Sequence, residues 1–269
     1  LLVLVFAAGM AFFWHRSVVL SDKLELIQRR IGQSRQEVLV ASQIKPAKPL
    51  YKAKVAIVLD DFGYNLNNID QLWAIGEPIT LSILPNLPYS RTISLAAEER
   101  GMEYILHLPL EPHENRWLEK RTILTSMTDE EILETLKWDM LSVPGLYGIS
   151  NHQGSKCTED KRVMSVIFGQ MKKDDLYFID SLVTSRSICG QASREAGIKF
   201  AARSVFLDNK TDEEYIAGQV RELAAKALAK GSAIGVGHDR PLTIKVIGDM
   251  LPELKEKGIR LVFASELTE

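Results

Sequence analysis

Short apolar runs alternate with longer segments of helical periodicity from residue 54 onward. The short runs are typical of strands, and the longer segments repeat apolar residues every three or four positions, as helices do. The runs predict strands at 55–59, 79–84, 103–106, 147–150, 176–179, 199–201, 233–236 and 260–263. The periodic segments predict helices at 67–75, 90–100, 128–142, 160–172, 211–229 and 241–257.

Two of the predicted helices carry start signals. Thr128 is followed by Glu131, and Thr211 is followed by Glu214. This spacing is typical of a capping box, in which the two side chains bond backbone N–H groups that the first turn leaves free. We therefore expect helices to begin at these two threonines.

The repeated β-then-α order predicts an α/β protein with a parallel sheet covered by helices. The almost wholly apolar strands agree with burial on both faces. A barrel and an open doubly wound sheet both fit this pattern. The chain has no Gly-x-Gly-x-x-Gly motif after the first strand and no phosphate-binding loop, which argues against a nucleotide-binding protein.

The first fifty residues differ from the rest. Residues 1–14 are uninterrupted apolar or small residues, which predicts a hydrophobic signal anchor or signal peptide over 1–16, with the anchor favoured. Residues 17–50 hold an amphipathic helix and a Pro/Lys linker, and the helix is either a plain stalk or a short coiled coil that pairs with a partner. The globular domain is expected over 51–269.

Charge and cysteine content exclude several functions. The net charge of the whole chain is −2, but residues 15–50 carry +4 and residues 51–269 carry −6. An acidic domain without basic, aromatic-rich patches is a poor binder of nucleic acid, which we exclude as a partner. Cys157 and Cys189 lack the spacing of a zinc finger or redox motif, although a single disulfide remains open.

Polar residues follow five of the predicted strands, where the active sites of parallel α/β proteins gather. They are Asp60-Asp61, His107 with Glu111 four residues later, Asn151-His152, Asp180-Ser181 and His238-Asp239. Each has an ordinary explanation alone, because a lone Asp after a strand usually caps a turn. Their recurrence at one rim predicts a shared site.

Two carboxylates and several imidazoles suit a divalent metal, with zinc favoured, and hence metal-assisted hydrolysis. If the first strand stays regular, only one of Asp60 and Asp61 faces the metal, because adjacent side chains point to opposite sides. A serine nucleophile is the competing chemistry. Ser155 and Ser181 are near the predicted site, but neither stands in a Gly-x-Ser-x-Gly motif.

Six segments, taken in order, resemble the divergent polysaccharide deacetylases, a bacterial branch of the polysaccharide deacetylase superfamily. They are residues 57–63, 81–85, 107–112, 148–155, 178–181 and 235–238. The resemblance implies a distorted (β/α) barrel of about seven parallel strands. It also implies that the protein removes acetyl groups from a cell-envelope polysaccharide.

The same resemblance implies roles for single residues. Asp60 would be the general base, Asp61 a metal ligand and His238 the general acid. His107 matches the first histidine of the metal motif, but the second position holds Glu111, so we expect His152 to replace the missing ligand, with Glu111 as second choice. The residues expected to contact substrate are Glu111, Asn151, Asp180 and Ser181.

The sequence therefore predicts a metal-dependent carbohydrate deacetylase, exported to the bacterial cell envelope and anchored in the inner membrane. The altered metal motif leaves a second function open. A barrel that has lost part of its ligand set would bind glycan or an envelope protein with little or no catalysis.

Overall fold

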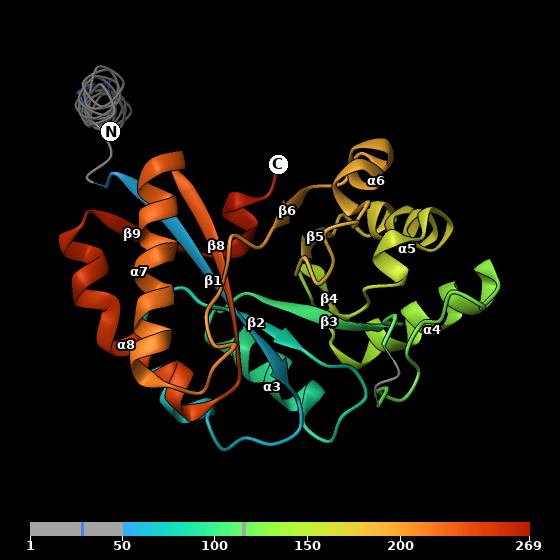
Figure 1. The fold of residues 1–269 in the computed structure, drawn as a ribbon, viewed down its shortest axis with the longest axis horizontal. Helices are drawn as coiled ribbons and strands as arrows, with labels where there is room; N and C mark the ends of the chain where they lie inside the picture. The colour runs from blue at the N-terminus through green and yellow to red at the C-terminus, as the bar shows by residue number, and fades with distance from the viewer. Residues whose placement is uncertain (1–27, 30–50, 115–116) are drawn as a thin grey trace, which may run out of the picture. The chain divides into compact units, whose positions relative to one another are not determined.

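The computed structural model describes residues 28–29, 51–114 and 117–269. The chain separates into two units, Leu1–Leu50 and Tyr51–Glu269, and all named strands belong to the second (Figure 1). The anchor expected over 1–16 lies outside the described residues, as does the stalk and linker segment except for Gln28 and Arg29. Within the described ranges, no helix combines the length and apolar character needed to cross a bilayer.

The second unit is built on one sheet of nine parallel strands. Eight of them follow the order β6-β5-β4-β3-β2-β1-β8-β7, and β9 pairs with β1 beside this path. Their bounds are β1 Ala53–Phe62, β2 Thr80–Ile83, β3 Tyr104–Leu110, β4 Gly148–Gln153, β5 Tyr177–Asp180, β6 Phe200–Ala202, β7 Val205–Phe206, β8 Ser232–His238 and β9 Ile259–Val262.

The sheet curls towards a barrel, and its two end strands are consecutive in the sequence. No pairing joins β6 to β7 within the described part of the chain. The two residues between them bridge the gap: the Arg203 N–H donates to the Asp180 carbonyl of β5 at 2.9 Å, and the Ser204 N–H donates to the Ile234 carbonyl of β8 at 2.8 Å. The architecture is therefore consistent with the expected distorted barrel, with an irregular seam at residues 203–204.

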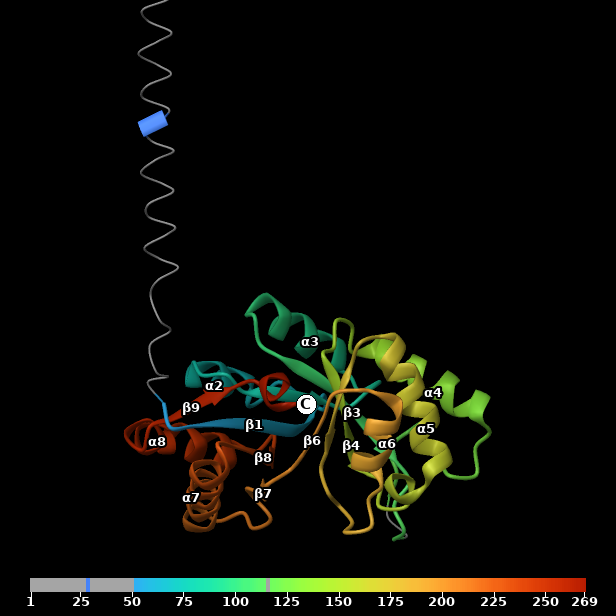
Figure 2. The same cartoon turned by 90° about the horizontal axis from the view of Figure 1, so that it is seen from above.

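Helices cover the outside of the curled sheet. In both views α7 and α8 lie on one flank and α4, α5 and α6 on the other (Figures 1 and 2). The helices are α2 Ile69–Ile75, α3 Ser90–Glu99, α4 Asp129–Ser142, α5 Lys161–Lys173, α6 Cys189–Ala196, α7 Glu213–Lys230 and α8 Pro241–Glu256, with short 3₁₀ helices η1 Cys157–Glu159 and η2 Ala264–Leu267.

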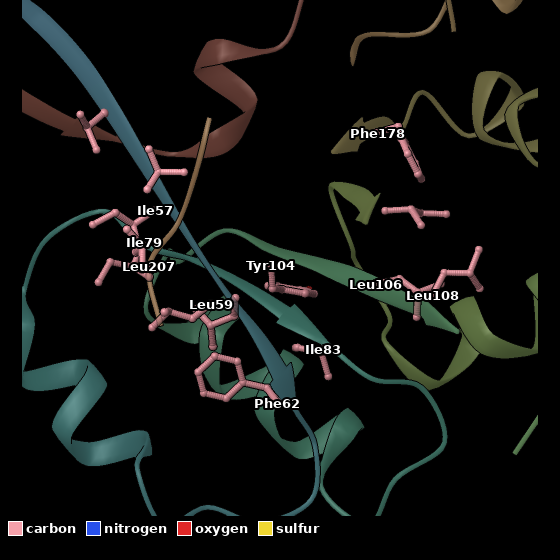
Figure 3. Packing of buried hydrophobic residues seen from close by; sticks show 14 of the residues in the cluster. Ile57, Leu59, Phe62, Ile79, Ile83, Tyr104, Leu106, Leu108, Phe178 and Leu207 are labelled. Atoms are coloured by element: carbon pink, nitrogen blue, oxygen red, sulfur yellow. The ribbon is translucent and has the colours of Figure 1, made fainter. Parts of the chain in front are cut away.

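Alternation along each strand divides the apolar residues into two cores. The odd-numbered residues Val55, Ile57 and Leu59 of β1 join the larger core between sheet and helices, part of which Figure 3 shows. Ala56 and Val58 join a smaller core made almost wholly of strand residues, which the curled sheet encloses. The next residue on this inner side of β1 is Asp60, so the inner face changes from apolar to polar towards the carboxyl end.

The amino-terminal end of the enclosed core is closed by η2. Ala264 packs in the inner core, and its N–H donates to the Thr80 hydroxyl at 3.0 Å. Glu103 beside it is buried and accepts hydrogen bonds from Thr80 and Tyr177, both at 2.8 Å. The carboxyl ends of the strands therefore form the end of the barrel that η2 does not cover.

Two elements and one helix start differ from the sequence-based predictions. Strand β7, of two residues, and helix α6, of eight, were not predicted. The predicted start of α4 is confirmed, since Thr128 and Glu131 form a reciprocal capping box. The predicted cap at Thr211 is wrong: α7 begins at Glu213, and the residue before it, Asp212, caps it by accepting from the Tyr215 N–H.

Both cysteines, Cys157 and Cys189, are buried free thiols, so the disulfide left open by the sequence is not formed.

A buried carboxyl group joins α4 to the loop after β2. Asp139 is fully buried, and its Oδ1 accepts a hydrogen bond from Asn86 Nδ2 at 2.7 Å, while Oδ2 lacks a partner among the described residues. Burial raises the pKa of Asp139 to about 7, against the opposing effects of the Asn86 hydrogen bond and the Arg121 charge. The folded protein therefore holds a proton here up to nearly neutral pH.

This raised pKa predicts how stability changes with pH. Because an unfolded aspartate titrates near 3.9, the folded state binds the extra proton between about pH 4 and pH 7, and the free energy of unfolding falls as pH rises through that window, by at most about 1.4 kcal/mol per unit. We measure the free energy of unfolding in urea at pH 4.5 and at pH 8. The value for Asp139→Asn, relative to that of wild type, should be higher at pH 8 than at pH 4.5.

Glu134→Gln is the matched control, since it changes an exposed carboxyl of the same helix to an amide. In Glu134→Gln, the change in the free energy of unfolding between pH 4.5 and pH 8 should be nearly the same as in wild type. An Asp139→Asn variant that loses the same stability at both pH values would show that the buried carboxyl is not the titrating group.

Candidate metal and catalytic centre

The end of β1 brings two neighbouring carboxylates to one place. The register of β1 against β2 shifts between Leu59 and Phe62, and Asp61 has a left-handed backbone with φ of 69°. The strand is therefore not regular there, so the condition attached to the expectation for the two aspartates is not met, and of the two only Asp61 belongs to the possible metal cluster. Asp60 Oδ1 lies 3.6 Å from His107 Nδ1, and Asp61 Oδ1 lies 3.4 Å from Nε2 of the same ring.

Asp61, His107 and His152 form a cluster that could hold a metal ion. One ligand atom from each lies within 4.8 Å of the others. Asp61 Oδ1 is 3.3 Å from His152 Nδ1, and it is a buried carboxylate oxygen without a hydrogen-bond partner in the described part of the protein. A buried charged oxygen facing two imidazoles fits a divalent cation, because the cation would satisfy all three donors at once.

A relay of hydrogen bonds orients the His107 ring. His107 Nδ1 is 2.8 Å from Ser150 Oγ, and Ser150 Oγ is 2.8 Å from Ser82 Oγ. The Ser82 hydroxyl also acts on the Asp60 carboxyl, whose pKa it lowers. If Ser82 donates towards Asp60, then Ser150 donates to Ser82 and His107 Nδ1 donates to Ser150. The Nε2 lone pair of His107 is then free to face Asp61 and a cation.

His238 approaches the cluster from the opposite side. Its Nε2 lies 4.0 Å from Asp61 Oδ2, and its Nδ1 lies 2.8 Å from Oδ1 of the fully buried Asp208. Asp208 Oδ2 also accepts from the His238 backbone N–H and from the Thr243 hydroxyl. Asp208 therefore orients this imidazole and places a carboxylate beside it.

The pKa shifts of Asp60, Asp61 and His238 differ in direction or in cause. Burial raises the pKa of Asp60, against the charges of His107 and His238. Burial alone would raise the pKa of Asp61 as well, but the neighbouring His107 and His152 imidazoles outweigh it and lower the pKa. Burial would lower the pKa of His238, yet the Asp208 hydrogen bond and charge raise it overall. Asp61 is thus held ionised, while the pKa values of Asp60 and His238 lie above their ordinary values.

Three of the predicted substrate-binding residues lie on adjoining strands but bond within the protein. Asn151 accepts from the Ser181 N–H and donates to the Gln153 carbonyl, both at 2.8 Å. Asp180 accepts from the Leu182 N–H and the Ser187 hydroxyl. The Ser181 hydroxyl is buried and lacks a partner in the described ranges.

Glu111, the second choice for the missing metal ligand, is not part of the cluster. Its Oε1 is 2.7 Å from Lys156 Nζ, and its Oε2 accepts two hydrogen bonds from Thr125 at 2.7 Å. Burial would raise the pKa of Glu111, but these partners lower it. Its carboxylate ties three segments of the rim together.

The structure does not support the alternative of a serine nucleophile activated by a histidine base. The Ser155 hydroxyl accepts from the His113 backbone N–H and donates to Glu114 at 3.3 Å. No histidine ring bonds the Ser155 or Ser181 hydroxyl within the described residues. The His113 ring is instead paired with Glu159 at 3.0 Å on the surface.

Sequence reasoning missed four residues of this centre: Asp208, Ser82, Ser150 and Arg203. Arg203 donates to the Ser181 and Leu182 carbonyls, and its charge acts on Asp180 and Asp60. A signal was present for Ser82 and Ser150, because a polar residue at an inner position of an apolar strand needs a partner. Asp208 also follows an apolar run, but Val205–Phe206 is too short to be recognised as a strand.

Comparison with known proteins places this geometry in a family. Residues 57–268 match the family model described as divergent polysaccharide deacetylase. The uncharacterized protein YibQ of Escherichia coli K12 is 34% identical over 234 residues, which are 87% of this chain and 73% of that protein. The matched residues include every member of the metal cluster, Asp208 and His238.

Solved structures share the fold. The uncharacterized protein ATU2773 of Agrobacterium tumefaciens superposes with a TM-score of 0.76 at 22% identity, covering 83% of this chain and 91% of that one. T48 deacetylase with substrate gives 0.54 at 16% identity, covering 82% and 94%. Wild-type BA3943, a CE4 family pseudoenzyme from Bacillus anthracis, gives 0.51 at 13% identity, covering 84% and 70%.

The fold is thus shared by an enzyme and by a pseudoenzyme, and the family model covers the barrel from residue 57 to residue 268, with its Asp/His/His cluster. The chain belongs to the divergent polysaccharide deacetylase family.

Proposed function

We propose that the protein is a metal-dependent hydrolase that removes acetyl groups from a cell-envelope polysaccharide. The observation that carries the proposal is the convergence of Asp61, His107 and His152 on one unpartnered carboxylate oxygen, with Asp60 on one side and His238 on the other. The apolar segment 1–14 supports export to the envelope and membrane attachment, by an anchor or a signal peptide.

Asp61, His107 and His152 would hold the ion, with zinc favoured by the mixed nitrogen and oxygen donors. When bound, such an ion supplies a Lewis acid that polarises the acetyl carbonyl and lowers the pKa of a water molecule. The Ser150 relay keeps the His107 ring oriented for this task.

Asp60 and His238 would divide the proton transfers. Asp60 accepts a proton from the attacking water as its oxygen bonds to the carbonyl carbon. His238, protonated and held by Asp208, donates a proton to the leaving nitrogen or oxygen as the bond from the carbonyl carbon breaks. The products are acetate and a free amino or hydroxyl group on the sugar.

A second candidate function rests on the missing motif histidine. Glu111 occupies that position and bonds Lys156 and Thr125 rather than the cluster, so metal binding depends on His152. If three ligands do not suffice, the protein binds glycan or an envelope partner without catalysis. Metal content distinguishes the two functions.

We expect the full chain to bind close to one divalent ion per molecule after purification with zinc supplied, measured by mass spectrometry. His107→Ala and His152→Ala should each lose it, because only one imidazole then remains beside Asp61. His113→Ala is the control, since this exposed histidine pairs with Glu159 outside the cluster. A folded wild-type protein that takes up no metal would refute the proposal of a metal-dependent hydrolase.

Ser150→Ala should weaken metal affinity by about tenfold to a hundredfold, the usual effect of removing a group that orients a ligand. The reason is that His107 loses the acceptor that fixes its tautomer. Ser94→Ala serves as the control, because it removes another buried serine hydroxyl, in α3. Unchanged affinity in Ser150→Ala would refute the relay. Competition with a chelator measures both variants.

Asp208→Asn should move the alkaline limb of the kcat profile to lower pH. In the wild type, Asp208 raises the pKa of His238, so the protonated form of His238 persists to higher pH. Without the Asp208 charge, burial lowers the pKa of His238. The measurement is acetate release from an acetylated chito-oligosaccharide across pH. Asp249→Asn, an exposed carboxylate change, should leave the limb in place; an unmoved limb in Asp208→Asn would exclude His238 as the acid.

A further inference from the structure

A hollow with a volume of about 560 Å³ lies among the helices that cover the sheet, between α3, α4 and the end of α5. Its walls are largely apolar: they include Met140 and Leu141 of α4, and Pro144 and Leu146 of the loop that leads into β4. Its lining contains none of the residues of the metal and catalytic centre. This hollow, called here the Leu141 groove, is therefore a separate feature of the domain.

Apolar side chains are open to solvent in and beside the groove. Leu141 is 70% exposed, whereas most large apolar residues of the domain are buried. Leu95 of α3 is also exposed and lies one helical turn from Arg91, another lining residue. A single exposed leucine is ordinary, but exposed apolar side chains that gather around a hollow mark an interaction surface.

The wall of the groove that leads into β4 is held in place by the barrel. The Tyr104 hydroxyl donates to the Pro144 carbonyl at 2.7 Å, and the exposed Tyr147 ring packs edge-on against the Tyr104 ring. Gly145 between them has a left-handed backbone with φ of 79°, and a Cβ at this position would collide with the Tyr104 hydroxyl. A groove with a fixed wall loses little conformational freedom on binding, which favours a specific partner.

The charge of the groove is opposite in sign to that of the domain. Arg91 and Lys137 are exposed, and neither side chain forms a hydrogen bond or an ion pair with any described residue. The acidic lining residue, Asp174, already accepts a hydrogen bond from Gln170 at 2.7 Å. Two unpaired cations thus border an apolar hollow in a domain of net charge −6, which fits a partner with acidic side chains.

The elements around the groove restrict the form of the partner. The strands on which α3 and α4 pack, β2 and β3, are each paired on both sides, so they offer no free edge to an added strand. A groove between helices typically receives an amphipathic helix, which inserts apolar side chains from one face. Acidic residues beside that face would then meet Arg91 and Lys137.

Two other occupants fit the groove less well. In a symmetric contact between two copies of this chain, the same surface meets itself, so the cations of one copy would approach those of the other. An anionic lipid surface would attract the two cations, but a planar surface does not fill a hollow, and the net charge of −6 repels the domain from it.

We propose that the Leu141 groove binds an amphipathic helix of a partner protein, with apolar side chains in the hollow and acidic side chains beside Arg91 and Lys137. Because the groove shares no residue with the metal cluster, the partner and a ligand of the centre can be bound at the same time. The inference holds whether or not the centre is catalytic.

The first test measures binding of the full chain to two cross-linked helical peptides of about 18 residues, a length that supports a helix in water. Both carry a leucine face, flanked by glutamates in one peptide and by lysines in the other. We expect the glutamate peptide to bind at least about tenfold more tightly, and Leu141→Glu to weaken its binding by about tenfold or more. Arg91→Glu combined with Lys137→Glu should reverse the preference, which misfolding would not do.

Leu228→Glu is the matched control. Leu228 is an exposed leucine, at 41%, on α7, which lies on the opposite flank from α4 (Figures 1 and 2). The proposal is overturned if neither peptide binds, if the lysine peptide binds as tightly, or if Leu141→Glu and Leu228→Glu have equal effects.

The second test identifies the natural occupant. A photo-reactive phenylalanine analogue replaces Leu141 in the full chain, in cells that carry this protein natively, and mass spectrometry sequences the cross-linked segment. We expect a segment of a different protein with an apolar helical face and flanking acidic residues. A cross-link to a second copy of this chain, a cross-link to lipid, or no cross-link would each contradict the proposal.

Discussion

The left-handed backbone at Asp61 is the constraint on which the centre depends. In a regular strand, Asp60 would point into the barrel and Asp61 would point to the outer core, where a carboxylate has no counterpart. The register shift after Leu59 turns Asp61 back to the inner rim, so that both carboxylates meet the His107 ring from its two nitrogen atoms. Aspartate tolerates positive φ better than most residues, which makes the sequence compatible with this bend.

The two aspartates differ in character because their surroundings differ. Asp60 is buried within the barrel, so its ionised form is disfavoured, whereas Asp61 lies between two imidazoles that favour the ionised form. The bend in the backbone thereby places two different carboxyl groups side by side: Asp61, which stays ionised, and Asp60, whose pKa is raised. This division is the usual way in which neighbouring carboxyl groups take separate roles.

Much of the fold was predictable because the sheet is parallel and buried on both faces. Runs such as 55–59 and 233–236 are strongly apolar, and their ends locate the site residues without knowledge of the strand order. The features that could not be predicted depend on the backbone conformation and on contacts between distant parts of the chain. The bend at Asp61 is invisible in a sequence that permits either conformation, and Asp208 follows a strand too short to show alternation.

The unpredicted residues share a physical cause. Ser82 and Ser150 are unremarkable alone, and they acquire a role only because the curl of the sheet brings β2 and β4 within hydrogen-bonding distance on its inner face. Asp212 and Thr211 compete for the same helix end, and the sequence does not reveal which side chain reaches the free N–H groups. Local patterns identified the elements, whereas side-chain partners across the barrel required the packed structure.

The pairing of β1 also governs when the domain can fold. This strand is the first of the barrel in the sequence, yet it pairs with β2, β8 and β9, and the last two come from the far end of the domain. Closing such a long loop has an entropic cost before its contacts form. A nascent chain therefore lacks two neighbours of its central strand until synthesis has nearly finished, so the barrel can be completed only after its last strands have been made.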